Sequence, residues 1–179
     1  MTVPAAPLLV RRLAPADAPA YRALMLEGYA CDPDAFTATV AERAGLPLAF
    51  WEARLAAGEL ASEVVFGALL DGRLAGAVGI GFEQRPKLRH KAGLFGMFVA
   101  HDARRRGLGR RLVDAALDEA RRRAGIVQLN LTVTEGNPAA ETLYAQCGFV
   151  PFGIEPMAVQ SGNGFRAKVH MRHCLHAEQ

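Results

Sequence analysis

The chain is poor in several features that define whole classes of protein. It has only three cysteines, Cys31, Cys147 and Cys174. Their odd number and wide spacing predict neither a disulfide framework nor a CxxC metal site. No apolar run approaches the ~20 residues of a membrane span, and the start, MTVPAAPLLVRRL, is too short and proline-rich for a signal peptide. We therefore expect free thiols in the cytoplasm, with no membrane and no metal.

The composition is that of one ordinary globular domain. The 179 residues fit a single domain over 1–179. Their hydrophobic fraction of 51% and charged fraction of 22% are typical. Net charge is only +3, from 21 Lys and Arg against 18 Asp and Glu, but the arginines cluster. The location of these clusters is therefore more informative than the total charge.

Hydrophobic periodicity and turn residues predict a mixed α/β domain with a central sheet. Strands are expected at 8–13, 64–70, 73–82, 94–99, 126–134, 149–160 and 165–175. Helices are expected at 15–30, 45–59, 108–124 and 139–147. We find no internal repeat and no linker, so all these elements belong to one unit.

The stretch HDARRRGLGRRL (101–112) places arginines and glycines between a buried strand and an amphipathic helix. The first N–H groups of a helix lack partners and attract anions, and glycine lets a ligand approach the backbone. Such a site suits a pyrophosphate. The stretch is neither a Walker A loop nor a GxGxxG fingerprint. A solvated charge run is the simpler alternative, but three cations at a helix start oppose the helix dipole, which favours an anionic ligand.

The stretch does match R-x-x-G-x-G at Arg104, Gly107 and Gly109. In this setting the motif resembles the GNAT superfamily of acyl-CoA-dependent N-acyltransferases. The strand LFGMFV before it, and the helix and strand at 108–134 after it, follow that family's order. The segment NPAAETLYAQCGF (137–149) resembles the family's second signature, N-x-x-A-x-x-L-Y-x-x-x-G-F. The resemblance is specific over residues 73–153. It implies a single-domain GNAT-like α/β fold, with a mixed, mostly antiparallel sheet of six to seven strands and about four helices.

The resemblance also implies a role for each part of the site. Backbone groups of Phe98 and Val99 would hold the acyl carbonyl and the pantetheine arm of acetyl-CoA, and Asn137 would face that arm. Tyr144 would protonate the departing thiolate, which suits a phenol that is neutral at pH 7. The CoA pyrophosphate would be held by Arg104, Arg105, Arg106, Gly107, Leu108, Gly109 and Arg110.

The general base stays open at this point. Family members often carry a carboxylate on the strand before the phosphate loop, but LFGMFVA has none. Glu83, His90, Glu135 or a water molecule could act instead. Two alternatives also stay open: Tyr144 as an ordinary half-buried aromatic residue, and Asn137 as only a helix N-cap. The C-terminal histidines do not predict a metal site, because strand alternation separates His173 from His170 and His176.

The expected function is transfer of an acetyl group from acetyl-CoA to a primary amine of a small molecule or peptide, by direct attack and without a metal. Whether the acyl group is acetyl or longer stays open. One alternative is a catalytically silent acyl-CoA-binding protein. A nucleic-acid-binding module is disfavoured, because no aromatic or helix-turn-helix pattern accompanies the arginines.

The acceptor and the oligomeric state are the least determined features. Glu27, Asp32 and Asp34 would attract a cationic amine, whereas the basic segment EQRPKLRHK (83–91) would attract an anionic acceptor. The two signals conflict. The final hairpin exposes a strand edge, which would be one route to a homodimer.

Overall fold

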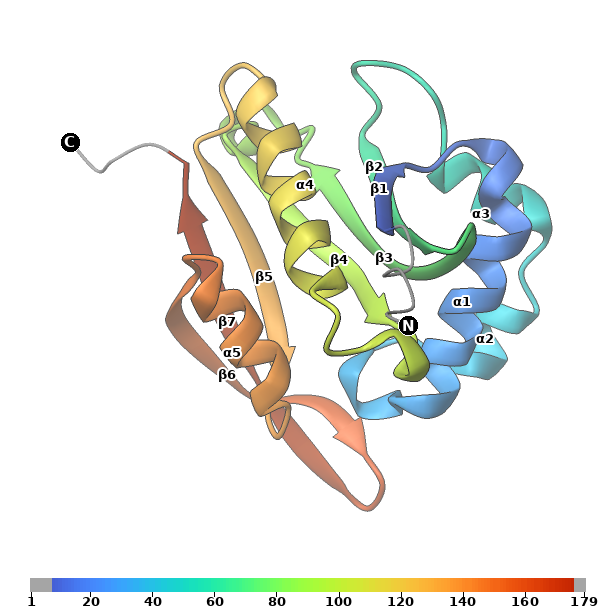
Figure 1. Cartoon of the computed structure of the whole chain (residues 1–179). Coiled ribbons are helices and arrows are strands. Elements are labelled where there is room, and N and C mark those ends of the chain that lie inside the picture. Colours follow the sequence, from blue (N-terminus) through green and yellow to red (C-terminus); the bar gives the residue numbers. More distant parts are fainter. Residues whose placement is uncertain (1–7, 176–179) are drawn as a thin grey trace, which may run out of the picture.

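The computed structural model describes residues 8–175 as a seven-stranded sheet with helices on both faces (Figure 1). The strands are β1 (Leu8–Arg12), β2 (Glu63–Leu70), β3 (Arg73–Phe82), β4 (Lys91–Val99), β5 (Gln128–Thr134), β6 (Val150–Ser161) and β7 (Gly164–Cys174). The helices are α1 (Ala18–Cys31), α2 (Val40–Ala44), α3 (Leu48–Arg54), α4 (Leu108–Arg122) and α5 (Pro138–Gln146). His176 lies outside the described residues. The predicted α/β fold and the order of its elements are confirmed.

Within residues 8–175 the structure adds one α-helix, α2, which makes five where about four were expected. Thr39 and Glu42 form a reciprocal capping box at its start: the Thr39 hydroxyl accepts from the Glu42 N–H at 3.3 Å, and Glu42 Oε2 accepts from the Thr39 N–H at 2.7 Å. The sequence T-x-x-E carries this signal. A helix of five residues has too few turns to give a hydrophobic period, so pattern analysis missed it.

The sheet has the strand order β1-β2-β3-β4-β5-β7-β6. Every neighbouring pair is antiparallel except β4 and β5, which are parallel because α4 forms the crossover between them. These two strands pair only over Lys91–Gly93 with Gln128–Asn130. Beyond Gly93 they diverge, which opens the sheet in its middle.

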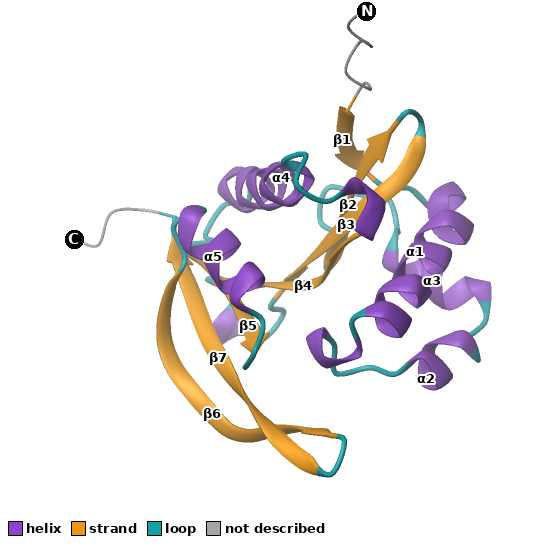
Figure 2. Ribbon diagram, turned by 60° about the horizontal axis from the view of Figure 1, so that its bottom comes forward, coloured by secondary structure: helices purple, strands orange, loops and turns teal. Residues whose placement is uncertain are grey.

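Different helices cover the two faces of the sheet (Figure 2). The helix α4 packs on β1 to β4 through an apolar stripe that includes Leu108, Leu112 and Val113. The helices α1 and α3 pack on the opposite face, where the Tyr21 and Trp51 rings meet edge to face at 5.6 Å. The helix α5 lies beside α4, over the β5–β7 side of the sheet.

Glycines on β3 leave room for an aromatic ring from β4. The Phe95 ring lies so close to Gly79 that a Cβ there would sit 2.3 Å from it, whereas a Cβ at Gly81 would meet the same ring at 3.7 Å.

We expect Gly79→Ala to lower the free energy of unfolding by about 1–3 kcal/mol, through overpacking, and Gly81→Ala to change it far less. Urea denaturation of both variants measures this difference, and equal effects would contradict the packing argument.

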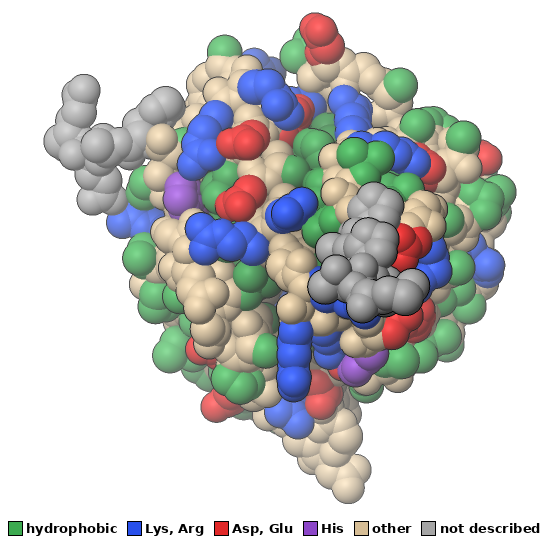
Figure 3. Space-filling model, in the orientation of Figure 1, with side chains coloured by type: hydrophobic (Ala, Val, Ile, Leu, Met, Phe, Trp, Pro, Cys, Tyr) green, Lys and Arg blue, Asp and Glu red, His purple; other side chains and the backbone are tan. Residues whose placement is uncertain are grey.

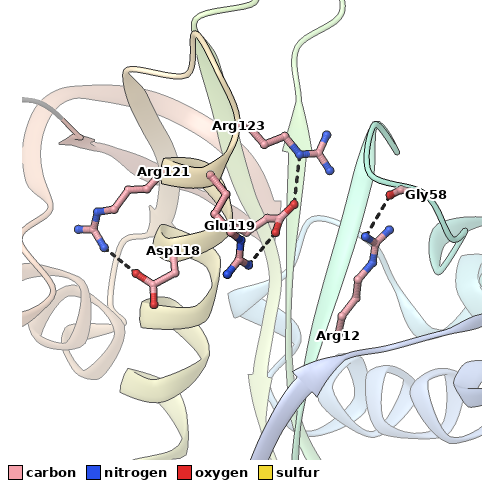
Figure 4. A network of polar contacts seen from close by, with 7 residues as sticks. Arg12, Gly58, Asp118, Glu119, Arg121 and Arg123 are labelled. Carbon is pink, nitrogen blue, oxygen red and sulfur yellow. Dashed lines mark hydrogen bonds and ion pairs between the residues drawn. The ribbon is translucent and has the colours of Figure 1, made fainter.

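Two arginines tie the long connection between α3 and β2 to the body of the protein; Figure 4 shows the contact of Arg12 with Gly58 and that of Arg123 with Glu119. Arg12 donates to the carbonyl oxygens of Ala56 at 2.9 Å and Gly58 at 3.1 Å. Arg123 donates to the Ala61 carbonyl at 2.8 Å and lies 3.7 Å above the centre of the Phe82 ring. The arginines at the end of α4 therefore have structural partners.

Candidate functional site

The arginine-glycine stretch forms the turn that leads into α4, as the sequence predicts. Arg105 (φ 63°) and Gly107 (φ 79°) both have left-handed backbone, which folds the loop into a tight concave turn. Gly107 is the N-cap of α4 and, being glycine, has no side chain that could cap the helix. Within residues 8–175, a Cβ on Gly107 would meet no atom within 4 Å, so no described residue crowds this helix end. The turn has the backbone geometry of an anion site at a helix N-terminus.

The arginines of this turn differ in their surroundings. Arg104 Nε donates to the Val99 carbonyl at 3.0 Å, and its guanidinium also pairs with Asp32. Arg104 therefore ties the end of β4 to the segment after α1. Arg110 pairs with Asp114 at 3.7 Å. Arg105 and Arg106 are exposed.

A cavity of about 120 Å³ lies where β4 and β5 diverge. Its walls are formed by β4, β5, α5 and the segment after α1. The lining residues are Leu94–Met97, Leu131–Thr134, Asn137, Ala140, Leu143, Tyr144, Ala35 and Phe36. Strand β4 has a bulge in this wall. The register between β3 and β4 shifts between the pairs Gly79–Phe95 and Ala77–Phe98, and Gly96, inside the shifted segment, has φ 59°. Among the described residues, the β5-side edge of β4 beyond Gly93 has no strand partner. Its backbone groups are positioned to bind an extended ligand.

The side chains of the expected carbonyl-binding residues do not line this cavity. The Phe98 side chain is buried against Gly28 of α1, where an added Cβ would lie 2.9 Å from the ring. Val99 is half-buried, and its carbonyl oxygen is used by Arg104. The predicted contacts of Phe98 and Val99 with a ligand would therefore have to be made by backbone groups.

Asn137, the N-cap of α5, and Tyr144, within α5, both line the cavity. The Asn137 side chain accepts from the Ala140 N–H at 3.1 Å, so its role as N-cap is real. Tyr144 is buried, with its ring 5.8 Å from that of Phe149 at an interplanar angle of 65°. Burial raises the pKa of the Tyr144 phenol well above its ordinary value, since desolvation disfavours the phenolate. The phenol is therefore protonated at neutral pH and can donate a proton or a hydrogen bond.

The three candidates for the general base lie at different ends of the sheet. Glu83 and His90 flank the β3–β4 connection, at the end of β4 that is paired with β5. At ~3.3 Å per residue, the β4 bulge at Gly96 is roughly 16 Å or more along the strand from that end. Glu135 directly follows β5 at the open end, two residues before Asn137, and its Oε2 accepts from the Ala167 N–H at 3.4 Å. Of the three, Glu135 is the one adjacent to the cavity.

Residues 32–37, which we call the strap, include two acidic residues that the sequence assigned to the acceptor site, but the partners of those residues were not predicted. Asp32 at one end pairs with Arg104 and lies 3.6 Å from His101. Asp34 pairs with Arg166 of β7 at 3.3 Å and accepts from the Ser161 hydroxyl at 2.5 Å. The strap thus joins the phosphate-loop turn to the terminal hairpin and forms one wall of the cavity. Its acidic residues were visible in the sequence, but their partners lie far away along the chain.

Other features of the described residues bear on cofactor class. Between residues 8 and 175, no group of three or more His, Cys, Asp or Glu is placed to hold a metal ion. The structure describes all three cysteines, and none is in a disulfide. No described helix is both long enough and apolar enough to cross a membrane.

Comparisons with solved structures find the same architecture in several bacterial proteins. An acetyltransferase of the GNAT family from Streptococcus pneumoniae is 26% identical, with a TM-score of 0.79 over 94% of this chain and 99% of that chain. A putative acetyltransferase from Salmonella typhimurium, solved with its cofactor acetyl-CoA, is 21% identical, with a TM-score of 0.78 over 97% and 96%. A ribosomal-protein-alanine N-acetyltransferase from Brucella melitensis is 24% identical, with a TM-score of 0.76 over 93% and 99%. A comparison with curated protein sequences finds no match.

The family comparison covers the strands and helices that build the cavity. The profile of the Acetyltransferase (GNAT) family matches residues 21–149, which include β4, the arginine-glycine turn, α4, β5 and α5. The match thus spans both segments that resembled this family in the sequence. The chain belongs to the GNAT acetyltransferase family.

Proposed function

We propose that the protein is an N-acetyltransferase that moves an acetyl group from acetyl-CoA to a primary amine by direct attack. The observation that carries this proposal is the cavity between β4 and β5, which is lined by Tyr144 and by the unpaired edge of β4. The uncapped start of α4 lies at the end of the loop that follows β4, where a pyrophosphate would bind.

In this proposal acetyl-CoA is the acyl donor and its thioester lies at the β4 bulge. Backbone groups of Phe98 and Val99 bind the acyl carbonyl and the pantetheine arm, and Asn137 faces that arm while capping α5. The turn from Arg104 to Arg110 binds the pyrophosphate. Tyr144, whose phenol is protonated at neutral pH, donates its proton to the departing thiolate. We assign the removal of the amine proton to water that Glu135 contacts at the open end of β5.

The test is calorimetric titration with acetyl-CoA, with CoA and ATP as controls, followed by a thiol-release assay on an amine panel. We expect micromolar binding of acetyl-CoA that ATP does not reproduce, and thiol release that depends on the amine. Tight binding without turnover on any amine would favour an acyl-CoA-binding protein. Failure to bind acetyl-CoA would refute the proposal.

The surface charge supports a site for a small anion over a nucleic-acid surface. Lys and Arg side chains are spread over the face that carries α4, with acidic side chains between them (Figure 3). Several are paired within α4 itself, as Arg121 is with Asp118 at 2.9 Å and Arg122 with Glu119 at 2.8 Å. We infer no binding to nucleic acid. The three cysteines, none of them in a disulfide, suit the reducing cytoplasm that we propose as its location.

We propose that the protein forms a homodimer through the edge strand β6. This strand ends the sheet and exposes apolar side chains, with Phe152 55%, Ile154 70% and Met157 66% exposed. A two-fold axis at a strand edge makes the surface complementary to itself. We expect sedimentation equilibrium to give the mass of a dimer, and Ile154→Lys to shift it to the monomer, while Val127→Lys, which replaces an exposed apolar residue outside β6, leaves it unchanged. A wild-type monomer at all concentrations would refute the dimer.

A further inference from the structure

A row of basic side chains runs along one face of β7. Successive residues of a strand point to opposite faces, so every second residue of β7 shares a face. On one face these residues are Arg166, Lys168, His170 and Arg172. The alternate residues Val169 and Met171 pack into the core, so the basic row lies on the sheet face opposite that packing.

This basic row adjoins the cavity. In the β5–β7 register, Lys168 is directly opposite Thr134, and His170 is directly opposite Thr132. Both threonines line the cavity. Opposed residues of antiparallel strands have Cβ atoms about 5 Å apart and share a face. Lys168 is therefore one strand away from the cavity wall, on the face where the strap lies.

Lys168 differs from its neighbours in the row by its partner. Arg166 pairs with Asp34 at 3.3 Å, and His170 Nε2 lies 3.0 Å from a Glu155 carboxylate oxygen. Lys168 Nζ instead donates to the Thr37 hydroxyl of the strap at 2.8 Å. Within residues 8–175 it makes no ion pair. An ammonium whose printed hydrogen-bond partner is a neutral hydroxyl keeps its full charge for an incoming anion.

The carboxylates of the strap do not offer a comparable site for a cation. Asp32 is already paired with Arg104 and Asp34 with Arg166. The rival basic segment, 83–91, lies at the far end of β4, where β4 and β5 are paired. Two of the three carboxylates that suggested a cationic acceptor are thus already paired, which favours an anionic group beside the cavity over a cationic one.

We infer that the acceptor is an amino acid, whose own carboxylate pairs with Lys168 while its amine attacks the thioester; this inference rests on the transfer reaction proposed above. The amino group loses one proton to water and forms a bond to the acetyl carbonyl carbon. The carbon–sulfur bond then breaks, and the thiolate takes the proton of Tyr144. The second proton lost by the nitrogen replaces the one given by Tyr144. The products are an N-acetyl amino acid and CoA.

The experiment compares pairs of acceptors that differ only in the carboxylate. Alanine, methionine and phenylalanine are each assayed against their carboxamides, with thiol release measured at saturating acetyl-CoA. We expect kcat/KM for the best amino acid to exceed that for its carboxamide about 10- to 100-fold, the range of a hydrogen bond to a charged group. The amine of a carboxamide loses its proton more readily, so amine basicity cannot produce this preference.

Two lysine variants test which residue causes the preference for the acceptor's carboxylate. We expect Lys168→Gln to raise KM for the amino acid about 10-fold or more, with little change in kcat, in KM for the carboxamide or in acetyl-CoA affinity. Lys87→Gln, in the rival segment, serves as the matched control and should change none of these. Equal use of acid and carboxamide, or the KM effect at Lys87 instead of Lys168, would overturn the inference while leaving the transferase intact. Thiol release from no amine at all would overturn both.

Discussion

Replacing Tyr144 by phenylalanine should lower kcat by about 10²-fold, at the lower end of what general acid catalysis contributes. Tyr144 lines the cavity, and its phenol is protonated at neutral pH, so it can donate a proton to the thiolate as the thiolate leaves. Phenylalanine keeps the edge contact with Phe149 but removes the proton donor. We therefore expect the affinity for acetyl-CoA, measured by calorimetry, to be nearly unchanged.

The matched control for this variant is Tyr29→Phe. Tyr29 is also buried, and burial raises the pKa of its phenol as well, but it does not line the cavity. We expect this variant to keep full kcat. Equal losses of kcat and of acetyl-CoA affinity in Tyr144→Phe would mean that the tyrosine has a structural role only.

Replacing Gly107 by aspartate should weaken acetyl-CoA binding roughly 10-fold or more, because the new carboxylate would stand where the pyrophosphate binds and repel it. No atom of residues 8–175 lies within 4 Å of the position of a Cβ at Gly107, so the substitution strains the backbone without a steric clash at the Cβ. A negative charge at a helix N-terminus also stabilises the helix, so we expect the protein to stay folded. Calorimetric titration of the variant measures the loss.

The control variant Gly125→Asp distinguishes repulsion of the pyrophosphate from the strain of placing aspartate in a left-handed backbone. We expect it to bind acetyl-CoA with wild-type affinity. Gly125 follows the C-terminal end of α4 with φ 84°, close to the 79° of Gly107, and a Cβ there would also meet nothing within 4 Å. The two substitutions impose the same left-handed backbone on aspartate at opposite ends of one helix. If both variants bound acetyl-CoA with wild-type affinity, the anion site at the start of α4 would be refuted.

The parts of the fold that follow from local sequence were predictable. The amphipathic period that begins at Leu108 and the turn at Asp71–Gly72 each depend on neighbouring residues, and the structure has the corresponding helix and hairpin. The glycine motif correctly predicted a turn at Gly107, since glycine is favoured where the backbone is left-handed, and Gly107 has such a backbone. The N-cap role of Asn137 was also readable, since it depends on a hydrogen bond only three residues along the chain.

Features that depend on distant partners could not be predicted. The strap is held by Arg104 and Arg166, which are 72 and 132 residues away from Asp32 and Asp34 respectively. No local period indicates such pairs, and Asp32 and Asp34 therefore suggested a site for a cation. The β4 bulge at Gly96 was equally hidden, because it depends on the register with β3. The alternating cations of β7 were visible, but their relation to the cavity required the β5–β7 register.

The early divergence of β4 from β5 has a consequence for the stability of the protein. Beyond Gly93, β4 presents an unfinished strand edge in the interior of the sheet. An extended ligand arm that hydrogen-bonds along it would act as an eighth strand and make the two halves of the sheet continuous. Such a ligand stabilises only the folded state, by about 2.7 kcal/mol at a concentration of 100 times its Kd. The melting temperature of this protein should thus rise with the fraction of molecules that have the ligand bound along β4.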